Sequence, residues 1–237
     1  MSFRILLIDD DPATVVVVQR VLTNAGFEVS PGHSGEEGLA LLRRDGLPHL
    51  AVVDLLMPGM GGLAFCQRLK EFSDVPLIVL TSVSAKETVV DTLERFAEDY
   101  IRKPFDPREL AARAKRVLRR IGEISYPLKP VTVVDDHLTI DFVNQRVVLD
   151  GRDVELGPTE SKLLYLLMKG AGRPQANSHL LGRLWPNQEV YEETLRVHIH
   201  RLRRKVEPRP EAPRYIVTER GIGYSFPPPR DNGDGTF

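Results

Sequence analysis

The sequence contains a single cysteine, Cys66, so no disulfide can form within the chain. Chains without internal disulfides are typical of reducing compartments, and we expect a cytoplasmic protein. No apolar run approaches the ~18 residues that are needed to cross a bilayer. The N-terminal segment MSFRILLIDDD also has three carboxylates where a signal peptide would have a small-residue cleavage site. We therefore expect neither a membrane span nor a secretion signal.

An excess of positive charge is missing as well. The formal net charge is −1 at pH 7, and the chain has 32 Lys and Arg against 33 Asp and Glu. Residues 1–122 contain 16 basic and 17 acidic residues, and residues 123–237 contain 16 of each. Overall charge thus gives no sign of nucleic-acid binding, which would have to depend on a local basic patch.

The first 120 residues alternate short apolar runs with amphipathic stretches, the pattern of repeated strand–helix units. Two runs, Leu50–Val53 and Leu77–Leu80, are wholly apolar, as expected for strands that are buried on both faces. We predict an α/β domain with a doubly wound, five-stranded parallel sheet. The strands are expected to end at Ile8, Ser30, Asp54, Thr81 and Ile101. Helices are expected near 13–25, 35–44, 62–72, 86–97 and 107–120.

The segment IGEISYPLKPV at 121–131 interrupts this pattern with two prolines and no clear periodicity, which favours a linker. Short strands and three helices follow, and the tail PPPRDNGDGTF is predicted to be disordered. The predicted strands are Leu138–Phe142, Arg146–Leu149, Val154–Leu156, Tyr215–Thr218 and Tyr224–Phe226, and the helices lie near 158–170, 177–185 and 192–206. The expected parts are a domain at 1–121, a linker at 122–131, an α+β domain at 132–228 and a tail at 229–237.

Polar side chains stand at the ends of the predicted parallel strands. Asp9 and Asp10 follow the first strand, Asp54 ends the third, Thr81 ends the fourth, and Lys103 follows the fifth. Because the carboxyl ends of parallel strands meet at one edge of the sheet, we expect these groups to lie together. Crowded carboxylates repel one another, and a hard divalent cation such as Mg²⁺ relieves that repulsion. A carboxylate in such a site can attack phosphorus, while an ammonium and a hydroxyl neutralise the phosphoryl oxygens.

The motifs ILLIDDD, VVDLLMPGMGG, IVLTS and DYIRKPF, in this order, resemble the receiver domain of bacterial response regulators, which has a flavodoxin-like fold. The resemblance implies that Asp54 accepts a phosphoryl group from a sensor histidine kinase. It implies Asp10, Asp54 and the backbone carbonyl of Leu56 as direct Mg²⁺ ligands, with Asp9 acting more remotely. Thr81 and Lys103 resemble the switch hydroxyl and the phosphate-binding lysine.

Two more features belong to this half of the chain. Tyr100 matches the aromatic residue that turns inward in the family when the switch hydroxyl moves. Asp11 precedes Pro12, and the residues alone favour Asp11 as a helix cap, since carboxylates are stabilising at helix N-termini.

The motifs GPTESKLLYLLM, LRVHIHRLRRKVEP and YIVTERGIGYSF resemble the winged helix-turn-helix domain of the OmpR/PhoB subfamily. Together with the receiver motifs they span nearly the whole chain. The resemblance implies a phosphorylation-controlled transcription regulator that binds double-stranded promoter DNA. The segment 186–191 matches the position at which family members touch RNA polymerase.

The helix at 192–206 can be interpreted without the family. Its pattern alone favours a solvated surface helix, but the preceding helix at 177–185 and the following hairpin favour DNA binding. The apolar side chains of the helix at 192–206 repeat at i, i+4, i+7 and i+11, which makes one buried stripe and leaves the cations on the other faces. Such a helix fits the major groove, where Arg contacts guanine and flanking cations meet phosphates. The predicted DNA contacts are Thr194, Arg196, Val197, His198, His200, Arg201, Arg203, Arg204, Lys205, Thr218 and Arg220.

Three positions depart from the family pattern or stay open. Glu193 stands where relatives usually have an arginine, while Arg196 can return that charge. Base preference should therefore differ from that of relatives. Trp185 is either a core anchor or a donor to a DNA phosphate.

The family's receivers form dimers through their fourth helix, fifth strand and fifth helix. Asp99, Glu109 and Arg113 match charged positions of that face, whereas Val89 replaces a cation and Phe96 a glycine. A homodimer that forms on phosphorylation is the natural hypothesis.

Two alternative functions share parts of this pattern. One is a DNA-binding regulator whose receiver no longer depends on phosphate; the complete acidic set with Thr81 and Lys103 argues against it. The other is a phosphatase of the haloacid dehalogenase type. Such enzymes need a second acid two residues after the nucleophile, where this chain has Leu56. We therefore expect no enzyme, but a regulator with at most slow auto-dephosphorylation.

Overall fold

The computed structural model describes residues 2–82, 97–121, 129–186 and 188–229. The chain divides into two compact units, Met1–Lys70 with Val75–Gly122 and Glu71–Asp74 with Glu123–Phe237. Among the described residues, no helix is both long enough and apolar enough to cross a membrane.

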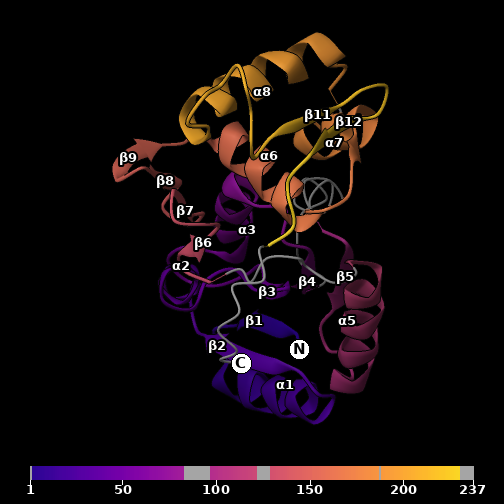
Figure 1. Cartoon of the computed structure of the whole chain (residues 1–237). Coiled ribbons are helices and arrows are strands. Elements are labelled where there is room, and N and C mark those ends of the chain that lie inside the picture. Colours follow the sequence, from indigo (N-terminus) through magenta and orange to yellow (C-terminus); the bar gives the residue numbers. More distant parts are fainter. Residues whose placement is uncertain (1, 83–96, 122–128, 187, 230–237) are drawn as a thin grey trace. The chain divides into compact units, whose positions relative to one another are not determined.

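The first unit has a five-stranded sheet in the order β2-β1-β3-β4-β5, and every neighbouring pair of strands is parallel (Figure 1). This confirms the predicted fold class. The strands are β1 (Arg4–Ile8), β2 (Glu28–Gly32), β3 (Leu50–Asp54), β4 (Leu77–Thr81) and β5 (Asp99–Arg102). The helices are α1 (Pro12–Asn24), α2 (Gly35–Asp45), α3 (Gly62–Phe72) and α5 (Pro107–Ile121). The helix predicted at 86–97 lies almost wholly outside the described residues.

Helices cover both faces of this sheet. On one face, side chains of α1 and α5 share an apolar core with β1, β3 and β4, which includes Val18, Leu110 and Ile78. On the other face, α2 lies so close to the sheet that a Cβ atom at Gly38 would be 2.3 Å from Ile8 and 2.8 Å from Phe65 of α3. All residues of β3 and β4 are buried, which is why their sequences are almost wholly apolar.

The second unit begins with a four-stranded antiparallel sheet in the order β6-β7-β8-β9. Three helices follow, and a second sheet in the order β10-β12-β11 completes the winged-helix domain. The strands are β6 (Thr132–Val133), β7 (Leu138–Asp141), β8 (Arg146–Leu149), β9 (Arg152–Glu155), β10 (Gln175–Ala176), β11 (Val217–Glu219) and β12 (Gly223–Ser225). The helices are α6 (Pro158–Lys169), α7 (Asn177–Leu184) and α8 (Glu192–Val206).

The structure of this unit differs from the prediction in two added strands and in the bounds of some predicted ones, of which β9 begins at Arg152 rather than at Val154. The two-residue strands β6 and β10 were not predicted, because so short a segment has no period of its own and pairs only through its partner strand. The first strand of the C-terminal hairpin begins at Val217 rather than at Tyr215. The backbone N–H groups of Tyr215 and Ile216 donate to the carboxylate of Glu207 instead of to a neighbouring strand.

Candidate functional site

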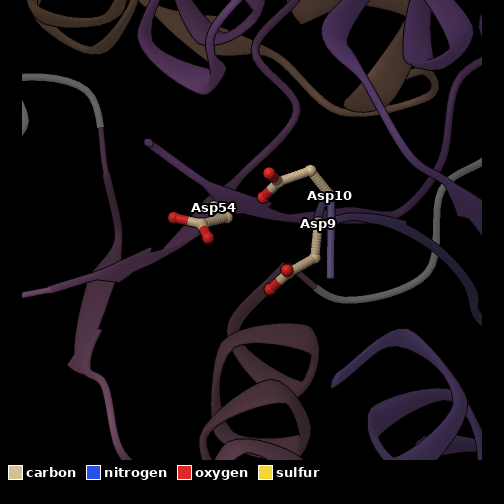
Figure 2. A group of neighbouring side chains, drawn as sticks. All are labelled: Asp9, Asp10 and Asp54. Atoms are coloured by element: carbon tan, nitrogen blue, oxygen red, sulfur yellow. The ribbon is translucent and has the colours of Figure 1, made fainter. Parts of the chain in front are cut away.

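Three carboxylates converge at the carboxyl ends of β1 and β3. In the sheet Ile8 is paired with Val53, so Asp9, Asp10 and Asp54 leave two adjacent strands at the same level. One ligand atom from each carboxylate lies within 4.8 Å of the other two (Figure 2). Asp9 is fully buried, Asp54 is 5% exposed, and Asp10 is exposed. The sequence prediction that these side chains lie together is therefore met by the geometry.

Lys103 joins this acidic cluster from the end of β5. Its Nζ atom lies 2.5 Å from Oδ2 of Asp54 and 2.7 Å from Oδ2 of Asp9. Burial raises the pKa of Asp9 and outweighs the opposing effect of its hydrogen bond with Lys103. Burial acts to lower the pKa of Lys103, but its hydrogen bonds with Asp54 and Asp9 outweigh this and raise it. The ammonium thus neutralises part of the negative charge that crowding has created.

Backbone groups hold the two buried carboxylates in place. The N–H of Leu56 donates to Oδ1 of Asp54 at 3.1 Å, and the N–H of Asp11 donates to Oδ1 of Asp9 at 3.0 Å. Helix α3 begins directly against this site, since a Cβ atom at Gly62 would lie 1.8 Å from the backbone oxygen of Asp54. Only a glycine fits there without moving the strand end.

Thr81 and Tyr100 occupy neighbouring strands at this edge. Thr81 is buried at the end of β4, and its hydroxyl donates to the carbonyl of Ser82 at 3.2 Å rather than to a carboxylate of the cluster. The N–H of Lys103 donates to the backbone oxygen of Thr81 at 2.7 Å, which ties the ends of β4 and β5 together. Tyr100 points outward from β5 and is 55% exposed.

The helix cap predicted at Asp11 is confirmed. Its carboxylate accepts hydrogen bonds from the N–H groups of Ala13 and Thr14 at the start of α1. These bonds lower the pKa of Asp11, with the largest effect coming from the hydroxyl of Thr14 at 2.6 Å. Asp11 is therefore a structural residue beside the acidic cluster.

In the second unit, α8 buries one stripe and exposes the opposite face. The predicted stripe of Leu195, Ile199, Leu202 and Val206 is buried. The exposed positions of the helix include three arginines, one histidine and one apolar side chain, Val197, which is 48% exposed. The exposed predicted DNA contacts on α8 are Arg196, Val197, His200, Arg201 and Arg204. Glu193 is exposed in the first turn, and Arg196 lies 3.6 Å from Glu192.

Two predicted contacts prove to be bound inside the domain. Arg203 donates through Nε and Nη2 to the backbone oxygen of Ile216, at 3.0 and 2.6 Å, and through Nη2 to the hydroxyl of Thr218 at 2.8 Å. Lys205 donates to Oε2 of Glu160 at 2.6 Å and to the backbone oxygen of Glu155. Both side chains lie on the flanks of the helix, where they meet neighbouring elements. These bonds show that both side chains support the domain from inside, and their contact with DNA stays a prediction.

His198 and Trp185 pack against each other, with ring centroids 5.1 Å apart. Both residues are half-buried. Nδ1 of His198 is buried and makes no hydrogen bond with the described residues. Burial, with a smaller contribution from the charge of Arg201, lowers the pKa of His198, which favours a neutral imidazole. Of the remaining predicted contacts, Thr194 is half-buried, whereas Thr218 and Arg220 are exposed.

Comparison with known proteins matches each unit to a family of its own. Residues 5–115 match the family described as "Response regulator receiver domain", and residues 151–226 match "Transcriptional regulatory protein, C terminal". The chain is 37% identical over 229 residues to the "Probable transcriptional regulator ycf27" of Porphyra purpurea, and the match covers 94% of each chain. It is 36% identical over 230 residues to the "DNA-binding response regulator MtrA" of Mycolicibacterium smegmatis, covering 97% of this chain and 99% of the relative.

The chain belongs to the OmpR/PhoB family of response regulators. It therefore combines a receiver domain with a DNA-binding domain and regulates transcription. The solved structure of the response regulator DrrB from Thermotoga maritima, an OmpR/PhoB homologue, is 32% identical, covers 96% of this chain and 100% of its own, and gives a TM-score of 0.45. The family assignment depends on the sequence matches alone.

The predicted dimer face of this response regulator carries ion pairs within the receiver. Arg113 donates to Asp99 at 2.8 Å and to Glu109 at 2.7 Å, and Arg116 donates to Asp99 at 2.6 Å. Val89 and Phe96, which replace the usual residues of this face, lie outside the described residues. The sequence did not predict Arg116, although its spacing of three residues from Arg113 places both on one face of α5.

Proposed function

We propose that Asp54 accepts a phosphoryl group from the phosphohistidine of a sensor histidine kinase and that this modification controls binding to promoter DNA. The observation that carries the proposal is the position of the Asp54 carboxylate. It is nearly buried, it lies against two further carboxylates, and it is paired with one ammonium. In the transfer, a carboxylate oxygen of Asp54 forms a bond to phosphorus as the phosphorus–nitrogen bond of the donor breaks, and the leaving imidazole takes up a proton.

The acidic cluster fits a hard divalent cation. Three carboxylates with ligand atoms within 4.8 Å of one another are the oxygen donor set that Mg²⁺ prefers. We infer that Asp10, Asp54 and the backbone carbonyl of Leu56 would hold the ion directly, with Asp9 acting more remotely. When bound, the ion would neutralise negative charge on the phosphoryl oxygens.

Lys103 and Thr81 supply the groups that would hold the phosphoryl group. Lys103 already bonds to Oδ2 of Asp54, so its ammonium needs only a short movement to meet a phosphoryl oxygen bound there. The hydroxyl of Thr81, which now donates to Ser82, would exchange that acceptor for another phosphoryl oxygen. Movement of Thr81 would leave room beside it, into which the exposed ring of Tyr100 could turn.

We call the hairpin formed by β11 and β12 the wing. We assign DNA contact to the exposed face of α8 and to the tip of the wing. Arg201 and Val197 would meet base edges in the major groove, and the other cations would meet phosphates. Arg220 at the tip of the wing would contact a phosphate or the minor groove. The remaining proposed contacts are Thr194, Arg196, His198, His200, Arg204 and Thr218.

The remaining partners follow from the family. We infer a cytoplasmic regulator that forms a homodimer on phosphorylation through the face with Asp99, Glu109 and Arg113. The segment 186–191 is proposed to touch RNA polymerase. The chemistry of the receiver would be limited to self-phosphorylation and slow auto-dephosphorylation.

The proposed domain boundaries of the chain are 1–121 for the receiver, 122–131 for the linker, 132–228 for the DNA-binding domain and 229–237 for the tail.

The test is phosphoryl labelling of the full-length protein with acetyl phosphate or a phosphohistidine donor in the presence of Mg²⁺. We expect acid-labile label on the unmodified chain and none on Asp54→Asn. Asp11→Asn is the matched control, because asparagine is as good a helix cap as aspartate and the carboxylate of Asp11 accepts its hydrogen bonds from Ala13 and Thr14 at the start of α1.

Undiminished labelling of Asp54→Asn would overturn the assignment of the phosphoacceptor. A second measurement concerns control of DNA binding. If phosphorylation of the unmodified protein left its DNA affinity unchanged, the alternative of a phosphorylation-independent regulator would replace the proposal.

A further inference from the structure

Two side chains one helical turn apart at the end of α8 grip the segment that leads into the wing. Arg203 holds the carbonyl of Ile216 with two N–H groups and the hydroxyl of Thr218 with one. Its guanidinium carbon also lies 5.9 Å from the ring centroid of Tyr224, which is on the second wing strand. Arg203 therefore contacts both strands of the wing.

Glu207 completes this grip from the C-terminal end of the helix. Its side chain is buried, with the residue 3% exposed. Its carboxylate accepts hydrogen bonds from the N–H groups of Arg214, Tyr215 and Ile216, at 2.7, 2.9 and 2.6 Å. A buried carboxylate with three backbone donors is strongly bound, since hydrogen bonds to a charged group are stronger than neutral ones. We call Arg203 and Glu207 the wing clamp.

The other strand of the wing is fixed independently. Strand β12 pairs with β10, and the N–H of Asn177 donates to the backbone oxygen of Ile222 at 3.2 Å. A Cβ atom at Gly223 would lie 2.1 Å from the backbone oxygen of Gln175, so the two segments are in close contact. The tip with Arg220 is thus held from one side by β10 and α7, and from the other side by the wing clamp on α8.

We propose that Arg203 and Glu207 are positioning residues for DNA recognition, which set the place of Arg220 relative to the exposed face of α8. The inference rests on the proposed contact of Arg220 with DNA. Through the clamp, the helix in the major groove and the tip of the wing form one rigid surface. Such a surface loses less conformational freedom on binding than a helix with a loosely attached wing.

The charges of the clamp distinguish this role from direct binding. Nε and Nη2 of Arg203 are already used by Ile216 and Thr218, and Glu207 has the same sign of charge as a phosphate. Removal of a carboxylate near DNA should by electrostatics alone strengthen binding, because repulsion from the phosphates is lost. Removal of a positioning carboxylate should instead weaken binding. The two explanations predict opposite signs.

The first experiment compares Glu207→Gln with Glu211→Gln in the full-length protein. The probe is the DNA duplex recovered by selection from a random library with the unmodified protein. We expect Glu207→Gln to lose about tenfold in affinity, since its amide cannot accept all three N–H groups. Glu211→Gln, which removes an exposed carboxylate nearby, should bind as tightly as the unmodified protein or more tightly. Tighter binding by a folded Glu207→Gln would overturn the proposal.

The second experiment uses Arg203→Lys, alone and combined with Arg220→Ala. Lysine keeps the charge but lacks the planar fork that holds Ile216 and Thr218. If Arg203 acts by placing Arg220, Arg203→Lys should weaken binding on its own but change affinity less than about twofold when Arg220 is already absent. This double-mutant cycle also decides the case if Glu207→Gln fails to fold, because Arg203 is only half-buried.

These outcomes distinguish failure of the clamp proposal from failure of the proposed DNA contact of Arg220, on which it rests. If Arg220→Ala alone leaves affinity unchanged, the proposed DNA contact of the wing is wrong. If Arg220→Ala weakens binding and Arg203→Lys weakens it by the same factor in both backgrounds, the clamp does not act through the wing. Arg203 would be a direct phosphate contact if Arg203→Lys bound DNA as tightly as the unmodified protein while Arg203→Met lowered the slope of log affinity against log salt concentration by about 0.9. That result would overturn the proposal.

Discussion

The Nζ atom of Lys103 lies 2.5 Å from Oδ2 of Asp54, and the same ammonium lies 2.7 Å from Oδ2 of Asp9. One cation therefore compensates two buried carboxylates from different strands. Lys103 is 23% exposed, so this pair is neither a surface ion pair nor a fully buried one. The lysine that is proposed to bind the phosphoryl group also stabilises the receiver before that group arrives.

The first prediction concerns Lys103→Met. Without Mg²⁺, this variant should be less stable than the unmodified receiver by about 2 kcal/mol, because the carboxylates lose their cation in a partly screened site. Mg²⁺ should then raise the melting temperature of the variant more than that of the unmodified protein. Thermal unfolding with and without Mg²⁺ measures both effects, and Lys115→Met on the exposed face of α5 is the control. If Mg²⁺ raised the melting temperature of all three proteins by the same amount, the prediction would be contradicted.

A second prediction concerns base recognition by Arg201, which is exposed on α8. Arg201→Ala should lower discrimination between the selected duplex and a scrambled one by about 1–3 kcal/mol, the usual value of a bidentate base contact. Dissociation constants for the two duplexes at several salt concentrations provide the measurement. Arg209→Ala removes an exposed cation beyond the helix and should leave the ratio unchanged. If Arg201→Ala lowered the affinity for both duplexes by the same factor, Arg201 would contact phosphate only.

Dimerisation of the receiver gives a third prediction. Sedimentation of the full-length protein should show a monomer alone and a dimer after addition of beryllofluoride, a phosphoryl mimic, with Mg²⁺. Arg113→Ala should weaken the dimer, because Arg113 is held in place by Asp99 and Glu109 on the proposed face. A monomer under both conditions would exclude this interface.

The fourth prediction concerns His49 and pH. Burial lowers the pKa of His49, and Nδ1 must stay unprotonated to accept a hydrogen bond from the N–H of Arg4 at 2.9 Å. The unfolded chain therefore binds more protons between the lowered native pKa and the unfolded value of about 6.5, so stability falls as the pH falls through this window.

His49→Asn separates this effect from that of other groups. The amide oxygen of asparagine can accept the same hydrogen bond without titrating. Urea unfolding from neutral pH to about 5 should show a smaller acid-side loss of stability for the variant than for the unmodified protein. Parallel curves for the two proteins would show that His49 does not contribute.

The elements with a strong period were predictable from sequence. Strands β3 and β4 and helix α8 have the predicted ends, because continuous apolar runs and a stripe at 3.6-residue spacing identify buried strands and amphipathic helices. The acidic cluster was predictable because the ends of parallel strands meet at one edge. That argument needs only the order of the strands, and not the side-chain contacts.

The contacts of flanking side chains were not predictable in the same way. Helical spacing places Arg203 beside the exposed face of α8 but cannot tell whether its guanidinium meets solvent or the carbonyl of Ile216, which is 13 residues away in sequence. Glu207 has a similar ambiguity, since its three donors come from a segment without regular structure. Such contacts are set by tertiary packing rather than by local pattern.

Gly62 touches no phosphoryl group, yet the absence of a side chain at this position allows α3 to begin against the backbone oxygen of Asp54. Any larger residue would push on the strand end that carries the proposed phosphoacceptor. A genetic screen for loss of signalling should therefore recover substitutions at Gly62 together with substitutions of the acidic residues Asp9, Asp10 and Asp54. The phenotype would arise from a displaced carboxylate in a chain that retains every charged group of its receiver.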